Sequence, residues 1–497
     1  MNESRIAQGP YAPLSTPAEI GLLARAIEWL RLLLLVWHGP DAPRGEAVRV
    51  GLIDFFIHLL AIALPWSTAV TTGLALAILL MMCLTHGLPR MIVDLRRPAC
   101  SFPLAMVGIA ILGTTWADGI PWSDRLHALE KVVKLLWLLP FYVHFQKSTS
   151  TTSVFVAYVT SNLLLLFLSF SVFLLPNFAV LFGKKDPGVP FKNYIDQSQA
   201  FAFIAVVLLG VAAESLRSQR RRLAFLCLAG ALAFFADLAF INIARTAFLY
   251  LPAMLVLLAL RYARSRISFA IFAGICVAVA GLSTTSPNLQ SKVSRLLKEF
   301  GAFETNTSVV EGFPAGGAER LEFWRKSIGF IRSAPILGHG TGSTKKLFAA
   351  AAIGQSGIIA KVVDNPHNQT LAVTIQWGIV GCTALYAMWG AHFLMFLGGL
   401  KWSQGNLLTW IGLLAVVQNV LSSVFNSHIF DFYQGWLYVL TVAIVGGTIQ
   451  AANARAATTP SEEPLLPAGA PPSPASPPTA RAELTGSHAA ALHYRAP

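Results

Sequence analysis

The feature that most constrains this chain is a series of long apolar runs, each about the length of a membrane-spanning helix. Lipid offers no hydrogen-bond partner to backbone N–H and C=O groups, so such runs must satisfy these groups internally, as α-helices. Hydrophobic residues make up 55% of the 497 residues and charged residues 12%, whereas a soluble domain carries roughly a quarter charged residues. The composition excludes a soluble enzyme, and the sequence predicts an all-α polytopic membrane protein.

The apolar runs predict about twelve transmembrane helices. They lie near residues 50–66, 68–86, 101–116, 127–145, 153–175, 199–215, 222–241, 245–260, 267–284, 368–397, 405–424 and 430–450. An even number of crossings places both termini on the same side of the membrane.

The basic residues indicate which side that is. The chain has 37 Lys and Arg against 24 acidic residues, a net charge of +13, and arginine clusters at 217–222 and 261–266 fall on the side of the termini. Short basic loops stay in the cytoplasm, so both termini are predicted to be cytoplasmic. The clusters are therefore interpreted as topology signals, and no nucleic-acid partner is expected.

These patterns divide the chain into five parts. The parts are a cytoplasmic N-terminal segment (1–49) with an interfacial amphipathic helix at 19–37, transmembrane helices 1–9 (50–284), a large external loop (285–367), transmembrane helices 10–12 (368–450), and a Pro/Ala-rich tail (451–497). Such a tail buries too little apolar surface to order itself, so it is predicted to be disordered and cytoplasmic.

The external loop contains one predicted helix. Apolar residues at 321, 324, 328 and 331 lie on one helix face, after Gly316 and before Pro335. Arg320 would lie in the first turn, where a guanidinium beside free backbone N–H groups makes an anion site. The alternative is that Arg320 pairs with a neighbouring glutamate on a solvated face. Arg325 on the same helix is a further candidate substrate contact.

A glycine-spaced turn, Gly338-His339-Gly340-Thr341-Gly342, follows this helix. Glycine allows backbone to approach a ligand or a lipid headgroup closely. The spacing is too weak for a dinucleotide motif, because no strand leads into it. His339 is a second histidine that could compete for the role of base or contact substrate.

The segment Asp364-Asn365-Pro366-His367-Asn368 comes directly before the tenth span. Asn365 is interpreted as the N-cap and Pro366 as the first helical residue, so His367 would lie in the first turn at the external surface. The positive end of the helix disfavours an imidazolium, so His367 is expected to be neutral near pH 7 and able to accept a proton. The alternative is an interfacial histidine bound to Asp364 or water. Asn368 is a candidate substrate contact.

Arg245 lies where the seventh span turns into the eighth, also at the predicted external face. A charge at membrane depth is costly, so such an arginine is a functional candidate, with snorkelling to headgroups as the alternative. Lys184 and Lys185 lie on the same predicted side and are candidate contacts to substrate phosphates.

Two arginines and a neutral histidine on one side suit an attack by a sugar hydroxyl on an anomeric carbon attached to a lipid diphosphate. The base takes the hydroxyl proton while the cations neutralise the departing diphosphate. No DxD-type carboxylate cluster occurs in the external segments, so we expect no metal and no cofactor, with arginine in the role of a divalent cation.

The segments IARTAFLY, ERLEFWRKSIGFIRSAPILGHGTG and NPHNQTLAVTIQWGIVG resemble the O-antigen ligase and polymerase superfamily of Gram-negative inner membranes, over about residues 50–450. The resemblance implies a GT-C-like, metal-independent, inverting glycosyltransferase at the periplasmic face. Its donor would be O-antigen on undecaprenyl diphosphate and its acceptor lipid A-core. The resemblance also implies that Arg245 and Arg320 bind the diphosphate and that His367 is the base.

Other functions would use the same features. An O-antigen polymerase or a protein O-oligosaccharyltransferase would need the same residues, although the basic external loop favours a large anionic acceptor. A lipid-linked glycan transporter also needs about twelve helices, but it would place ionisable residues near the bilayer midplane. A structural scaffold gives no reason for the positions of His367 and Arg245.

Overall fold

The computed structural model describes residues 43–86, 88–175, 177, 188–262, 316–402 and 407–458, with isolated positions between 274 and 294. The chain divides into two units, Met1–Asn453 and Ala454–Pro497, and the fold below is that of the first. Several predicted features lie outside the described residues: the interfacial helix at 19–37, most of the span at 267–284, Lys184 and Lys185, and the tail beyond 458.

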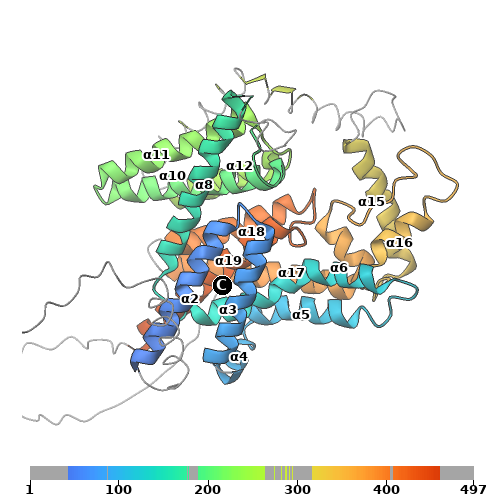
Figure 1. The fold of residues 1–497 in the computed structure, drawn as a ribbon, viewed down its shortest axis with the longest axis horizontal. Coiled ribbons are helices and arrows are strands. Elements are labelled where there is room, and N and C mark those ends of the chain that lie inside the picture. The colour runs from blue at the N-terminus through green and yellow to red at the C-terminus, as the bar shows by residue number, and fades with distance from the viewer. Residues whose placement is uncertain are drawn as a thin grey trace, which may run out of the picture. The chain divides into compact units, whose positions relative to one another are not determined.

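The described residues form helices and contain no strand, which confirms the predicted all-α class. The α-helices are α2 (Pro43–Ala63), α3 (Thr68–His86), α4 (Leu88–Asp94), α5 (Pro98–Leu112), α6 (Trp122–Val133), α7 (Leu138–His144), α8 (Thr151–Leu174), α10 (Tyr194–Arg217), α11 (Arg221–Ala236), α12 (Ala247–Tyr262), α15 (Gly316–Ser333), α16 (Ser343–Ala350), α17 (Gln369–Trp402), α18 (Leu407–Ser422) and α19 (Phe432–Thr458) (Figure 1). A 3-10 helix (Lys134–Trp137) joins α6 to α7, and a π-helix (Asp237–Ile241) continues α11.

Five of the described helices are long and apolar enough to cross a membrane. They are Thr151–Leu174, Tyr194–Arg217, Arg221–Ile241, Gln369–Gly398 and Phe432–Ala457, and four shorter apolar helices are Thr68–Met82, Pro98–Leu112, Ala247–Tyr262 and Leu407–Ser422. Each of the nine overlaps a predicted span, which supports the membrane class. The total of twelve crossings stays a prediction.

Burial distinguishes central helices from peripheral ones. In the most apolar stretch of α10, and likewise of α19, 78% of the residues are buried inside the protein, whereas in α8 the share is 39%. The buried side chains of the central helices include large aromatics such as Phe201 of α10 and Tyr438 of α19. The helices α10 and α19 therefore lie inside the bundle, and α8 presents much of its apolar surface outward, as a lipid-facing helix does.

The segment predicted as a span at 127–145 is helical throughout 127–144, and its crossing of the membrane stays a prediction. The segment consists of α6, the 3-10 helix and α7, and α6 carries Asp124, His127, Glu130 and Lys131. These charged and polar side chains leave α6 with one apolar face only, as expected of a helix at an interface rather than one surrounded by lipid.

The glycine turn packs into a break in α17. At Trp377 and Gly378 the backbone leaves helical geometry, which frees carbonyls before the break and N–H groups after it. The N–H groups of His339 and Gly340 donate to the carbonyls of Ile375 and Gln376, both at 2.9 Å. In return, the N–H of Ile379 donates to the carbonyl of Pro335 at 2.8 Å. The turn thus satisfies backbone groups that lipid could not.

The positive φ angles of this turn explain its glycines. Gly338 has φ +68°, and a Cβ added there would lie 2.5 Å from the backbone of Trp377. Gly340 has φ +84°, and its Cβ would lie 2.5 Å from the backbone of Ala117. The sequence predicted close backbone approach at this turn, and for these two glycines the neighbouring group is the protein's own backbone.

The helix predicted in the external loop is confirmed as α15, but its apolar face is not the face that is most buried. Phe323 and Ser327 are buried, whereas Leu321 and Ile328 are exposed. The reason is tertiary, because the ring of Phe323 packs edge-on against Phe348 of α16 at 5.7 Å. Arg320 is the fifth residue of α15, one position beyond the first turn. Both α15 and α16 pack against α17 (Figure 1).

Candidate active site

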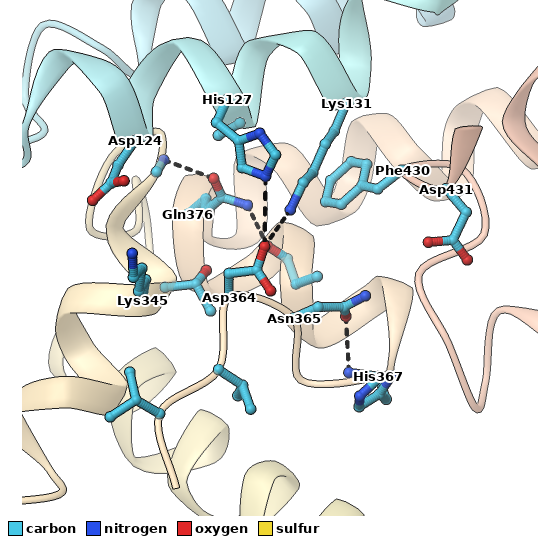
Figure 2. A pocket seen from close by; sticks show the side chains of 16 residues that line it. Asp124, His127, Lys131, Lys345, Asp364, Asn365, His367, Gln376, Phe430 and Asp431 are labelled. Carbon is cyan, nitrogen blue, oxygen red and sulfur yellow. Dashed lines mark hydrogen bonds and ion pairs between the residues drawn. The ribbon is translucent and has the colours of Figure 1, made fainter. Parts of the chain in front are cut away.

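A cavity of about 520 Å³ lies where five segments of the chain meet. Its lining comes from α6, the N-terminus of α16, the loop before α17, α17 itself and the loop before α19 (Figure 2). The lining residues are Asp124, His127, Ala128, Lys131, Gly342, Thr344, Lys345, Val362, Val363, Asp364, Asn365, His367, Ala372, Gln376, Phe430 and Asp431. The predicted base His367 therefore lines a cavity that combines charged and polar side chains with apolar surface.

One wall is a single face of α6. Asp124, His127, Ala128 and Lys131 follow the spacing of one helix face, so all four reach the same cavity. Lys131 forms an ion pair with Asp364 at 2.7 Å, and His127 Nε2 lies 3.7 Å from the same carboxylate (Figure 2). Burial alone would raise the pKa of Asp364, but the hydrogen bond and charge of Lys131 outweigh it and hold that pKa below its usual value. Asp364 is thus held ionised at neutral pH.

The predicted helix cap at Asn365 is wrong. The helix α17 begins at Gln369, and Asn368 is its cap, because its Oδ1 accepts the N–H of Leu371 at 3.0 Å. His367 precedes the cap and has φ +55°, a left-handed conformation outside any helix. Asn365 Oδ1 instead accepts the N–H of His367 at 2.9 Å. His367 is therefore oriented by a turn, and not by the first turn of the helix.

The ring of His367 is held by the loop before α19. Its Nδ1 lies 3.0 Å from Asn426 Oδ1. Asn426 Nδ2 donates in turn to Asp431 Oδ2 at 2.9 Å, and the same oxygen lies 3.0 Å from His428 Nδ1. The predicted alternative of a histidine bound to Asp364 does not describe this contact, because Asp364 bonds to Lys131.

Lys134 fixes the loop that carries Phe430 and Asp431. This buried lysine donates to the carbonyls of Phe430 at 2.9 Å and Asp431 at 2.8 Å. Gln369 Oε1 accepts the N–H of Ile429 at 2.9 Å, which ties the same loop to α17. The cavity wall is therefore rigidly connected to the helix that follows His367.

Arg320 does not line the cavity but lies on the helix beside it. It precedes Phe323 and Trp324 by three and four residues, so the three share one face of α15. Trp324 Nε1 donates to the carbonyl of Pro366 at 3.1 Å, and the ring of Phe323 lies 6.2 Å from that of His367. The structure therefore places Arg320 about one helical turn from the residues that contact the His367 loop.

Arg245 also lies outside the cavity lining, in the segment between the π-helix and α12. The N–H of the preceding Ala244 donates to Ser198 Oγ of α10 at 2.9 Å. Near the start of α10, Asp196 accepts from Gln434 of α19 at 3.2 Å, three residues beyond Asp431. Arg245 thus lies at the end of the bundle that carries the cavity.

The remaining candidates have structural contacts. His339 Nε2 donates to the carbonyl of Phe330 at 2.8 Å and so closes the end of α15. Arg325 forms a bidentate ion pair with Glu322, with N–O distances of 2.7 and 2.6 Å, and the Arg325 side chain is 69% exposed. Asn368 caps α17, as described above. None of these three lines the cavity.

Sequence reasoning missed most of the cavity wall. The signal for α6 was present, because Asp124, His127 and Lys131 follow helical spacing, but a transmembrane span was read over part of it. Lys345 lies in the first turn of α16 and lines the cavity. The sequence analysis treated it only as part of the basic external loop and did not single it out. Asp431 carried no local signal.

The described residues contain no group of three or more His, Cys, Asp or Glu that could hold a metal ion. The metal-free character of the reaction remains a prediction.

Residues 230–386 match the family model described as O-antigen ligase. The matched segment covers less than half of the chain and contains Arg245, α15 with Arg320, the glycine turn and His367. A search of curated proteins gave no match.

Proposed function

We propose that this chain, whose residues 230–386 match the O-antigen ligase family model, is a glycosyltransferase that ligates O-antigen from undecaprenyl diphosphate onto lipid A-core. The reaction would be metal-independent and inverting, on a GT-C-like scaffold. The observation that carries the proposal is the position of His367 in a cavity lined by charged, polar and apolar side chains, with Arg320 on the adjoining helix.

The chemistry follows from these positions. A hydroxyl of the acceptor sugar enters the cavity and gives its proton to His367 as its oxygen attacks the anomeric carbon of the donor. The bond from that carbon to the diphosphate oxygen breaks, and the diphosphate leaves with the electron pair. Arg320 and Arg245 neutralise the charge that develops on the leaving group. A single displacement from the opposite side inverts the anomeric centre.

The cavity lining suits a sugar. Asp364, Asn365 and Gln376 offer hydrogen-bond acceptors and donors, and the ring of Phe430 offers an apolar surface. Lys345 is the lining cation without an ion pair among the described residues, whereas Lys131 is paired with Asp364. Lys345 is therefore positioned to attract a phosphorylated acceptor or donor.

The orientation proposed for the protein has both termini in the cytoplasm of a bacterial cell and the cavity in the periplasm, with the chain in the inner membrane. The course of α5 supports this. Its N-cap is Arg97, in a basic segment expected inside. Beyond its other end, Gly113 accepts the N–H of Thr341 of the glycine turn at 2.9 Å. The helix thus runs from the basic side to the cavity side.

The test is reconstitution of the full-length protein in liposomes with undecaprenyl-diphosphate-linked O-antigen and lipid A-core. The expected product is a ladder of O-antigen on lipid A-core, unchanged by EDTA. Loss of product with EDTA and recovery with Mg²⁺ would contradict the metal-independent mechanism. Growth of the lipid-linked chain without lipid A-core would identify a polymerase, and transfer to protein Ser or Thr an oligosaccharyltransferase. Movement of donor across the bilayer without new glycosidic bonds would identify a transporter.

Arginine variants test the leaving-group role. The change Arg320→Gln removes the cation and should lower transfer by roughly 10²-fold or more, as loss of one electrostatic stabiliser does. Arg332→Gln is the matched control, because Arg332 is exposed near the far end of the same helix. Equal activity of the two variants would exclude Arg320 from the reaction.

A further inference from the structure

We propose that Asn426 and Asp431 are positioning residues that set the tautomer of His367, so that Nε2 carries the lone pair that accepts the acceptor's proton. This inference rests on the proposed role of His367 as the base. Its observation is the linear chain of contacts His367 Nδ1, Asn426 and Asp431, with distances of 3.0 and 2.9 Å.

The first step is the orientation of the Asn426 amide. A carboxylate has no hydrogen to donate, so only the NH₂ group of Asn426 can face Asp431. The NH₂ nitrogen lies 2.9 Å from Asp431 Oδ2. The carbonyl oxygen of the same amide must then face His367, from whose Nδ1 it lies 3.0 Å away.

The second step is the proton on His367. The amide oxygen of Asn426 can only accept, so Nδ1 of His367 must donate and carries the hydrogen. A neutral imidazole has one N–H, so the other ring nitrogen, Nε2, has the free lone pair. The backbone supports this orientation, because Asn365 Oδ1 accepts both the N–H of His367 at 2.9 Å and the hydroxyl of Ser427 at 2.8 Å.

The third step is the charge that appears during the reaction. When Nε2 takes the proton, the ring becomes an imidazolium, and the Asp431 carboxylate stabilises it through the polarised amide of Asn426. Asn426 is only 8% exposed and His428, which also donates to Asp431, is fully buried, so the middle of the chain of hydrogen bonds is shielded from water, whereas Asp431 is 32% exposed on the cavity. Lys134 holds the carbonyl of Asp431 at 2.8 Å and so keeps the carboxylate in place.

Two variants separate positioning from packing. Asn426→Leu keeps the number and branching of the side-chain heavy atoms but removes the acceptor for Nδ1–H. Asp431→Asn keeps the shape but lets the Asn426 amide turn over, because an amide can donate as well as accept. Asp118→Asn is the control, since Asp118 is exposed between α5 and α6 and lies outside the cavity lining.

The first measurement does not depend on activity. In full-length protein labelled with ¹⁵N-histidine, the His367 signal is identified by its loss in His367→Ala. We expect the Nδ1–H tautomer in the wild type and in Asp118→Asn, and a shift toward the Nε2–H tautomer in Asn426→Leu. The Nε2–H tautomer in the wild type would overturn the proposal.

The second measurement is transfer by the reconstituted protein. We expect kcat to fall in Asn426→Leu by roughly 10²–10⁴-fold with KM little changed, as when a histidine base loses its correct tautomer. Neither Asn426→Leu nor Asp431→Asn should lower the transfer rate further in a His367→Ala protein, because the effects of residues that act as one unit do not add. A rise in KM alone in Asp431→Asn, or a further loss in the His367→Ala background, would show that Asp431 acts on the sugar directly and overturn the proposal. A wild type with the Nδ1–H tautomer that transfers no sugar would refute the proposed function while supporting the tautomer.

Discussion

Asp364 connects the loop that carries His367 to α6. Its ion pair with Lys131 joins two segments that are 233 residues apart in the sequence. The sequence offered Asp364 or water as the partner of His367 only in the alternative of an interfacial histidine. The structure pairs Asp364 with Lys131, because a turn at His367 sends the ring toward Asn426. Local spacing could not reveal this choice, since the partners come from other elements.

The ion pair of Asp364 has a pH signature. The hydrogen bond and charge of Lys131 hold the pKa of Asp364 below its usual value, so the stabilisation is present above that usual value and is lost as the pH falls through the lowered pKa. The side chain is 51% exposed, so solvent screening keeps its contribution to about 1 kcal/mol or less. We expect Asp364→Asn to melt slightly below the wild type at pH 7, with a smaller difference at pH 3, below the usual pKa of a carboxyl group.

Thermal melting at the two pH values checks this, with Asp118→Asn as the exposed control. A difference between wild type and Asp364→Asn that stays the same at both pH values would contradict the ion-pair account.

At the scale of elements, the glycine turn and the break in α17 form one unit. The helix α15 and the turn after it were predictable from apolar spacing, Gly316 and Pro335. The partner of the turn was not, because the break at Trp377 and Gly378 gives no local signal beyond a single glycine in an apolar run. The unit anchors α15, and with it Arg320, to the helix that begins beside His367.

Substitution of Gly338 tests this anchor. At φ +68° with backbone 2.5 Å from an added Cβ, Gly338→Ala should strain the turn and lower the free energy of unfolding by about 1–3 kcal/mol or more. Gly329→Ala on α15 is the control, because Gly329 is helical and has open space around it, so alanine should be neutral or stabilise by about 0.5–1 kcal/mol. Thermal unfolding in detergent measures both, and equal destabilisation would contradict the proposed docking.

For the molecule as a whole, hydropathy predicted the class and most of the apolar helices. Nine described apolar helices overlap predicted spans. The span predicted at 127–145 joined the amphipathic α6 to the buried α7, so the sequence analysis did not single out the α6 wall of the cavity. The cavity itself joins residues from Asp124 to Asp431, and no pattern along the sequence could predict that convergence.

The proposed orientation of the whole chain can be tested by thiol labelling. Ile353, 80% exposed after α16, should react as Ile353→Cys with a membrane-impermeant reagent in cells whose outer membrane alone is permeable. Arg220, exposed between α10 and α11, should react as Arg220→Cys only after the inner membrane is opened. The unmodified chain gives the background of its own cysteines. The reverse pattern of labelling would contradict a periplasmic cavity.

The most direct test of the central claim is the single-turnover rate of sugar transfer to lipid A-core by His367→Ala, compared with the wild type in the same liposomes. The account predicts a rate lower by roughly 10²–10⁴-fold, as expected when a general base is removed, with an unchanged melting temperature. A folded His367→Ala protein that transfers O-antigen at nearly the wild-type rate would contradict it.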